Sequence, residues 1–118
     1  MLSLRVAGPA ALLVAKLHKI QERMGTGRQT DKDALDVLRL LRGTSANDLE
    51  TRYRRLQQDP RSRDVAGQGL GVLEEQFSNR HAAGVVMLLR AAGSLADSEE
   101  LGVSCEVLVA DLLSALGS

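Results

Sequence analysis

Hydrophobic residues recur at helical spacing along most of the chain. The first such segment has one apolar face, formed by Ala10, Leu13, Leu17, Ile20 and Met24. Residues three or four positions apart lie on the same side of an α-helix, so this spacing predicts an amphipathic helix. Pro9 suits its first position, and Gly25 and Gly27 are expected to end it.

Two later helix starts are predicted from polar residues that precede apolar runs. Thr30 followed by Asp33, and Ser45 followed by Asp48, resemble capping boxes, with Asp in place of the usual Glu. The second helix is expected to end at Gly43. The third is expected to run through the polar segment RYRRLQQ to the Asp-Pro pair that follows it.

The remaining segments are also expected to be helical. Residues 62–78 are weakened as a helix by about 1 kcal/mol for each of three glycines relative to alanine. These are Gly67, Gly69 and Gly71. Their spacing allows close packing or marks a loop. Residues 81–93 are the most apolar and are expected to be a central buried helix. After a polar break at 94–102, residues 105–116 are expected to form the last helix.

The N-terminal segment has a different pattern. Residues 2–6, LSLRV, alternate and include a β-branched residue, which predicts a short strand. The expected fold class is therefore mostly α, an irregular bundle of five to six helices with one short N-terminal strand at most. Residues 1–118 are expected to form one domain. Within it, 9–42 would form a helical hairpin and 44–118 the remaining helices.

The composition narrows the range of partners. Of the 118 residues, 44% are hydrophobic and 2% aromatic, so the core must be aliphatic. Tyr53 and Phe77 are the only residues among Phe, Tyr and Trp, which weighs against modules that stack single-stranded bases on several aromatics. Residues 1–63 hold 13 Lys and Arg against 7 Asp and Glu, and residues 64–118 hold 2 against 8. This split favours an anionic partner, attraction between copies, or attraction between the halves of one fold.

The single cysteine and the hydropathy indicate where the chain resides. Cys105 is the only cysteine, so an intrachain disulfide cannot form, and this cysteine content fits a reducing cytoplasm. Its apolar neighbours predict a buried small side chain and not a nucleophile. No apolar run approaches the roughly 20 residues of a membrane span. A soluble cytoplasmic protein without membrane association is expected.

Several familiar chemistries lack their residues. His18 and His81 have no zinc-ligand spacing with Cys105, and there is no phosphate-binding loop and no G-x-S-x-G elbow. No catalytic residue and no metal ligand is therefore predicted. An Arg-rich stretch supplies a candidate nucleic-acid-binding face, or only a solvated helix face. Its residues are Arg52, Arg54, Arg55, Arg61 and Arg63.

A polar cluster is expected where the first two helices meet. Asp33 and Asp36 are three residues apart and share a face of the second helix. Lys16 lies at the edge of the apolar face of the first helix. If the helices pack as a hairpin, these groups could face each other across the seam. They would then form either a structural Lys–Asp network or a ligand site.

The same residues carry a family resemblance. The A-K-L-x-x-I-x-x-R pattern from residue 15 and the K-D-x-x-D pattern from residue 32 resemble nucleotidyltransferase-fold proteins of the AbiEii abortive-infection toxin type. The resemblance covers residues 2–42, about a third of the chain. It implies a phosphate- or nucleotide-binding role for Lys16, Arg23, Lys32, Asp33 and Asp36. That family also has a Gly-Ser motif and strand carboxylates in a D-x-D arrangement, which hold Mg²⁺ and are not found here.

The resemblance therefore implies the helical C-terminal half of such a protein without its catalytic half. The expected function is a non-catalytic helical module, without a cofactor, that associates with a protein partner or with a second copy. One alternative is a subunit that completes a nucleotidyltransferase site in trans, with Mg²⁺ and a nucleoside triphosphate. A second alternative is nucleic-acid binding through the Arg-rich face.

Overall fold

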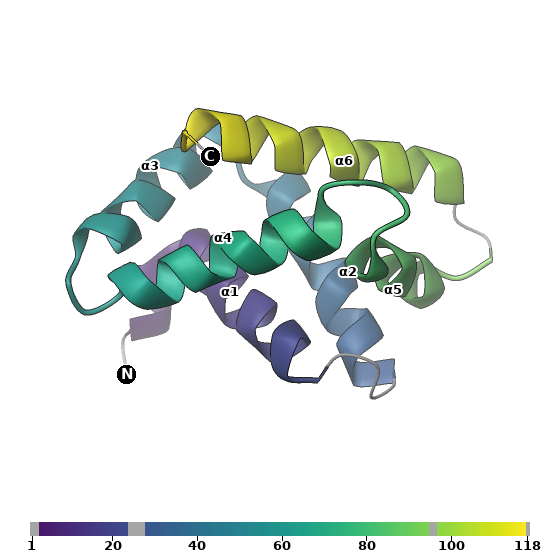
Figure 1. The fold of residues 1–118 in the computed structure, drawn as a ribbon, viewed down its shortest axis with the longest axis horizontal. Coiled ribbons are helices and arrows are strands. Elements are labelled where there is room, and N and C mark those ends of the chain that lie inside the picture. The colour runs from purple at the N-terminus through teal and green to yellow at the C-terminus, as the bar shows by residue number, and fades with distance from the viewer. Residues whose placement is uncertain (1–2, 24–27, 95–96, 118) are drawn as a thin grey trace.

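The computed structural model describes residues 3–23, 28–94 and 97–117, without the side chains of 3–7, 28 and 29. These residues form α1 (Ser3–Glu22), α2 (Arg28–Gly43), α3 (Ala46–Gln58), α4 (Arg63–Phe77), α5 (Ala83–Ala92) and α6 (Ser98–Ala115) (Figure 1). No strand occurs among them, so the mostly α fold class is confirmed. The helix end expected at Gly25 and Gly27 lies outside the described residues, as does Met24.

The N-terminal segment is helical and not extended. The short strand expected at residues 2–6 is therefore wrong where the chain is described, and Leu2 lies outside that part. A strand needs a second strand to pair its backbone groups, whereas a helix pairs them within one segment. Gly8 has a φ of 66° and interrupts α1 just before Pro9, so α1 is kinked there.

The helix starts show which capping residues act as expected. Ser45 is the N-cap of α3, and its Oγ accepts a hydrogen bond from the backbone N–H of Asp48 at 3.1 Å. The capping box expected at Thr30 is wrong, because α2 already begins at Arg28. The hydroxyl of Thr30 instead donates to the carbonyl oxygen of Arg23 at 3.0 Å, which ties the start of α2 to the end of α1.

The last helix is longer than its apolar pattern predicts. α6 begins at Ser98, seven residues before the expected start at residue 105. Asp97 is its N-cap and accepts a hydrogen bond from the backbone N–H of Glu100 at 3.1 Å. Asp97 and Glu100 have the spacing of a capping box, so the sequence did contain the information that places this start.

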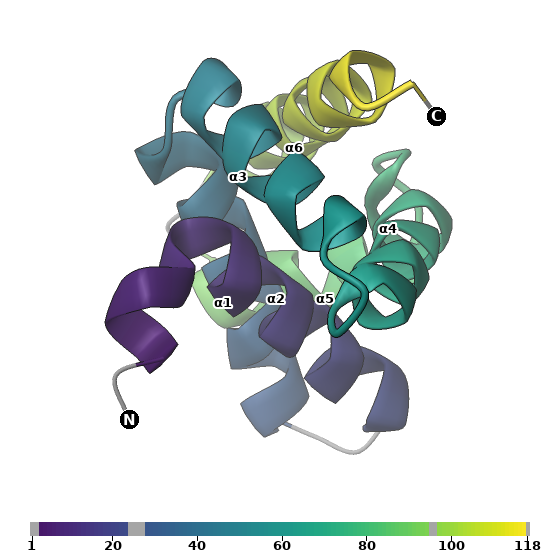
Figure 2. The same ribbon diagram turned by 90° about the vertical axis from the view of Figure 1, so that its left-hand side faces the viewer.

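The helices pack around one aliphatic core. α2 packs most extensively against α5, and α1 lies against α2, α3 and α4 (Figure 2). Tyr53 and Phe77 are fully buried in this core. The hydroxyl of Tyr53 donates to the carbonyl oxygen of Ala66 at 2.7 Å, which joins α3 to α4. The single phenolic hydroxyl is therefore satisfied inside the core.

One glycine of α4 allows this helix to pack closely against Tyr53 of α3. Gly69 is buried in α4, where an added Cβ would lie 2.9 Å from the Tyr53 hydroxyl oxygen. Gly67 and Gly71 have no such neighbour within 4 Å. Of the three glycines, only Gly69 therefore supports close packing, and none of them breaks the helix.

Candidate functional site

Lys16 joins α1 to α2 through two carboxylates. Its Nζ lies 2.9 Å from Oδ1 of Asp33 and 2.9 Å from Oδ2 of Asp36. Arg39 lies 3.4 Å from the other oxygen of Asp36. The structure thus brings together Lys16, Asp33 and Asp36, the three side chains that the sequence places at this seam. We call Lys16, Asp33, Asp36 and Arg39 the polar cluster.

Helical spacing explains how each member reaches the cluster. Asp33 and Asp36 lie three residues apart on α2, and Arg39 follows after three more. Lys16 lies one position before the fully buried Leu17. Its aliphatic stem can therefore run along the apolar seam while its ammonium group reaches the carboxylates.

Burial differs sharply within the polar cluster. The side chain of Asp33 is fully buried, whereas those of Lys16 and Asp36 are 26% and 35% exposed. Oδ2 of Asp33 has no hydrogen-bond partner among the described residues. The charge of Asp33 is thus compensated on one oxygen only, and it depends on Lys16 for that compensation.

The ammonium group of Lys16 is firmly held in its charged form. Hydrogen bonds to Asp33 and then to Asp36 raise the pKa of Lys16 above its ordinary value of 10.5. The two cations and two carboxylates of the polar cluster balance, so no net positive charge remains for a phosphate. A shallow groove of about 290 Å³ runs beside it, lined by Leu12, Lys16, Asp36, Arg39 and Leu40.

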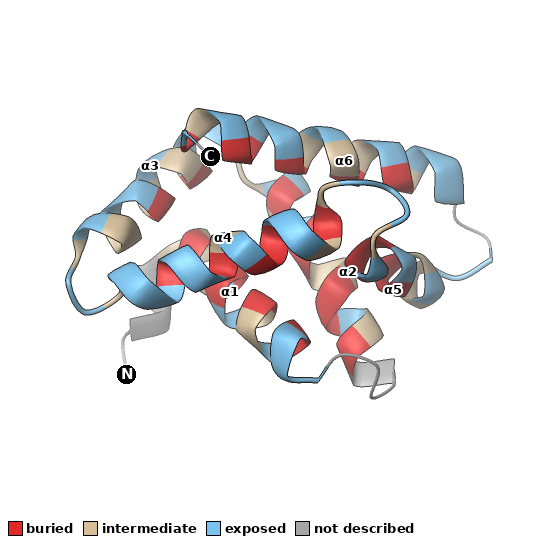
Figure 3. Ribbon diagram, in the orientation of Figure 1, coloured by how far each residue is buried: buried red, intermediate tan, exposed pale blue. Residues whose placement is uncertain are grey.

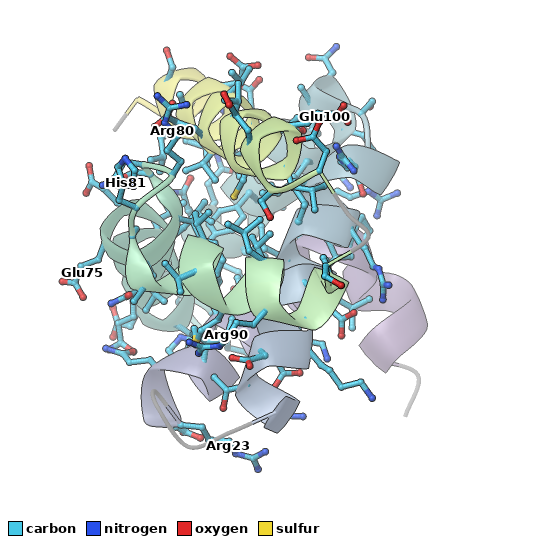
Figure 4. All side chains as sticks on the ribbon, turned by 90° about the vertical axis from the view of Figure 1, so that its right-hand side faces the viewer. Arg23, Glu75, Arg80, His81, Arg90 and Glu100 are labelled. Atoms are coloured by element: carbon cyan, nitrogen blue, oxygen red, sulfur yellow. The ribbon has the colours of Figure 1, made fainter. Side chains whose placement is uncertain are left out.

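The other residues of the predicted nucleotide site lie elsewhere. Arg23 is exposed near the end of α1, at the lower edge of the view in Figure 4. Lys32 is exposed while its neighbour Asp33 is buried, so the two side chains leave α2 on different sides. The structure therefore gathers Lys16, Asp33 and Asp36 but not Arg23 or Lys32.

Asp31, next to the polar cluster in sequence, belongs to a different contact. Its Oδ1 lies 3.1 Å from Nη2 of Arg90, and its Oδ2 accepts from Nε of the same guanidinium at 3.2 Å. This paired contact joins α2 to α5, where Figure 4 labels Arg90. Asp31 therefore reinforces the most extensive helix pair in the fold.

Most of the Arg-rich face is paired with nearby acids. Arg52 lies 3.1 Å from Asp48, Arg54 lies 3.0 Å from Glu50, and Arg61 lies 3.2 Å from Asp59. Arg55 and Arg63 are exposed as well. Pairing within α3 and the following turn reduces the positive potential that this face offers to a phosphate backbone.

Cys105 is fully buried, as its neighbours predict. Burial raises the pKa of its thiol to about 12. A thiol in this environment stays protonated and unreactive.

The described residues contain no candidate metal site and no candidate membrane span. No three His, Cys, Asp or Glu side chains gather there as a possible metal site. None of the helices in that part of the chain has the length and hydropathy that a membrane span requires.

The outer face of α6 is a feature that the sequence expectations missed. Val103 and Val107 are 38% and 52% exposed, and Ala110 is exposed on the same side. Spacings of four and three residues place these three side chains in one line along the helix, which we call the α6 stripe. The buried side of α6 carries another apolar row, which includes Cys105 and Val109.

Figure 3 shows how α6 lies on the rest of the fold. Its buried positions face the other helices and its exposed positions form the outer edge of the molecule. Arg42 of α2 donates to the hydroxyl of Ser104 at 3.3 Å, which helps to fix this rotation of α6. The apolar residues at 103, 107 and 110 show in the sequence that α6 has a second apolar face, but only the fold shows that this face is the one left uncovered.

Comparisons with known proteins returned no relative. No family model matches the chain, and no curated protein or solved structure matches it significantly.

Proposed function

We propose that this chain is a non-catalytic helical module that binds another protein through the outer face of α6. The observation that carries this proposal is the α6 stripe, an apolar line that the described fold leaves in solvent. Exposed apolar side chains are common singly, but an aligned set on one helix is typical of a contact surface.

The polar cluster supports the non-catalytic part of the proposal. Its one buried carboxylate, that of Asp33, is already paired through Oδ1 with the ammonium group of Lys16 at 2.9 Å. A triphosphate would have to displace Asp33 or Asp36 from Lys16 and leave a carboxylate without its cation. A relation to the C-terminal region of nucleotidyltransferase-like proteins stays a prediction that rests on the sequence patterns around residues 15 and 32.

Site-specific photo-cross-linking tests this proposal. A photoreactive amino acid replaces Val107 in the full-length chain, which is then irradiated in an extract of its own cells. The matched control carries the same group in place of Val86, a valine of α5 that is 41% exposed. We expect a discrete protein adduct from position 107 only, with the attached peptide identified by mass spectrometry. Equal adducts from both positions, or none from position 107, would contradict the proposal.

A further inference from the structure

The charges beside the α6 stripe carry information about its partner. Glu100 and Asp111 lie along one side of the stripe, and Glu99 lies along the other. All three are exposed, and Figure 4 labels Glu100 at the surface of α6. An apolar line is thus bordered by carboxylates on both sides.

None of these three carboxylates forms an ion pair within the described fold, although Arg80 lines the same surface hollow as Glu99. From residue 91 to residue 118 the sequence has no Lys or Arg at all. Arg52 and Arg54 of α3 pair with acids on their own helix, and Arg54 also donates to the carbonyl oxygen of Ala115 at the end of α6. The negative potential around the stripe is therefore available to a partner.

Resting on the proposed function, we infer that the outer face of α6 takes a basic amphipathic helix of a partner protein. The apolar side of that helix covers Val103, Val107 and Ala110. Lys and Arg on both of its flanks meet Glu99, Glu100 and Asp111. α6 has 18 residues, so a partner helix of about five turns matches its length.

A second copy of this chain fits the surface less well. Two α6 helices packed face to face would bring two sets of carboxylates together with no basic residue between them. Like charges placed opposite each other oppose association. On the basic half of another copy, Arg52 and Arg54 are already engaged in ion pairs on α3.

A designed peptide tests the inferred chemistry with the full chain. The probe is a fluorescein-labelled helical peptide of about 18 residues, with Leu on one face and Lys and Arg on both flanks. One control peptide has the same composition in an order that removes the apolar face, and another carries Glu in place of Lys and Arg. We expect the probe to bind with micromolar affinity and both controls to bind at least about tenfold more weakly.

Variants of the chain locate the binding. Val103→Ser/Val107→Ser should weaken binding at least about tenfold, whereas Val86→Ser should leave it unchanged. Glu99→Gln/Glu100→Gln/Asp111→Asn should weaken binding severalfold and reduce its dependence on salt. Circular dichroism of each variant checks that the helices are retained. We expect them to be, since all the replaced side chains are at least one-third exposed.

Four results would overturn the inference. The first is equal binding of the probe and the rearranged peptide, and the second is unchanged affinity in the stripe variant. The third is a dimer of the chain alone, in sedimentation, that Val103→Ser/Val107→Ser dissociates, because the occupant would then be a second copy. The fourth, an adduct from position 107 together with failure of the peptide, would refute the basic helix and leave the proposed function standing.

Discussion

Replacing Lys16 by Met should lower the free energy of unfolding by about 3 kcal/mol. The substitution keeps the aliphatic stem but removes the ammonium group, so the fully buried Asp33 loses its cation. Breaking one side of a buried pair costs about 3–5 kcal/mol, and an exposed pair costs less than about 1. We expect the lower end of the first range, because a quarter of the Lys16 side chain is exposed. Urea denaturation at neutral pH measures the change.

Two further variants separate this effect from a general effect of losing charge. Lys19→Met removes an exposed lysine from the same helix and should change stability by less than about 0.5 kcal/mol. Lys16→Met/Asp33→Leu should recover much of the loss, because apolar side chains often replace a buried pair without destabilisation. A Lys16→Met variant as stable as the parent chain would show that the polar cluster contributes little to folding.

The free energy of unfolding should fall steeply as the pH rises above about 9. Burial raises the pKa of the Cys105 thiol from 9.0 to about 12, and it raises the pKa of the Tyr53 hydroxyl from 10.0. Hydrogen bonds to the two carboxylates raise the pKa of Lys16 from 10.5. Each group therefore keeps a proton in the folded state that it loses earlier in the unfolded chain.

The sign is the same for all three groups. Their stabilising contribution is complete below the unfolded-state pKa and is lost as the pH rises towards the folded-state pKa. Between pH 8 and pH 11, Cys105 alone should account for a loss of about 3 kcal/mol. Urea midpoints measured across this range give the slope, and the absorbance of tyrosinate should appear only as the chain unfolds.

Cys105→Ala provides the internal control for the alkaline prediction. The variant lacks the thiol, so its stability should fall less between pH 8 and pH 11 than that of the parent chain. A parent chain with constant stability over that range would mean that none of the three groups is held protonated by the fold. Identical slopes for the two proteins would mean that Cys105 is not.

Local patterns predict most of this fold because they act within a few residues. The spacing of apolar residues finds the helices, Ser45 marks the start of α3, and Asp59 follows its last residue. The prediction of an N-terminal strand fails because five alternating residues carry no information about whether a second strand is present to pair with them. The cap predicted at Thr30 is wrong because the hydroxyl of Thr30 donates to the carbonyl oxygen of Arg23, at the end of another helix. A local pattern does not reveal that contact.

The polar cluster is predictable in part for the same reason. Helical periodicity places Asp33 and Asp36 on one face of α2 and predicts that Lys16 could meet them. Periodicity does not reveal that Asp31 pairs with Arg90, because that contact depends on how α5 packs on α2. The α6 stripe needs the fold as well, since only packing shows which of two apolar faces stays exposed.

The central claim is that the polar cluster holds α1 against α2 and is not a nucleotide site. The most direct test is the melting temperature of the chain, and of Lys16→Met, over increasing concentrations of ATP with Mg²⁺. A ligand that binds the folded state raises the melting temperature as its concentration exceeds its dissociation constant. Because the ammonium group of Lys16 is already paired with Asp33 and Asp36, we predict that ATP leaves the melting temperature of both proteins unchanged. A rise that grows with ATP concentration in the parent chain and is absent in Lys16→Met would contradict the claim.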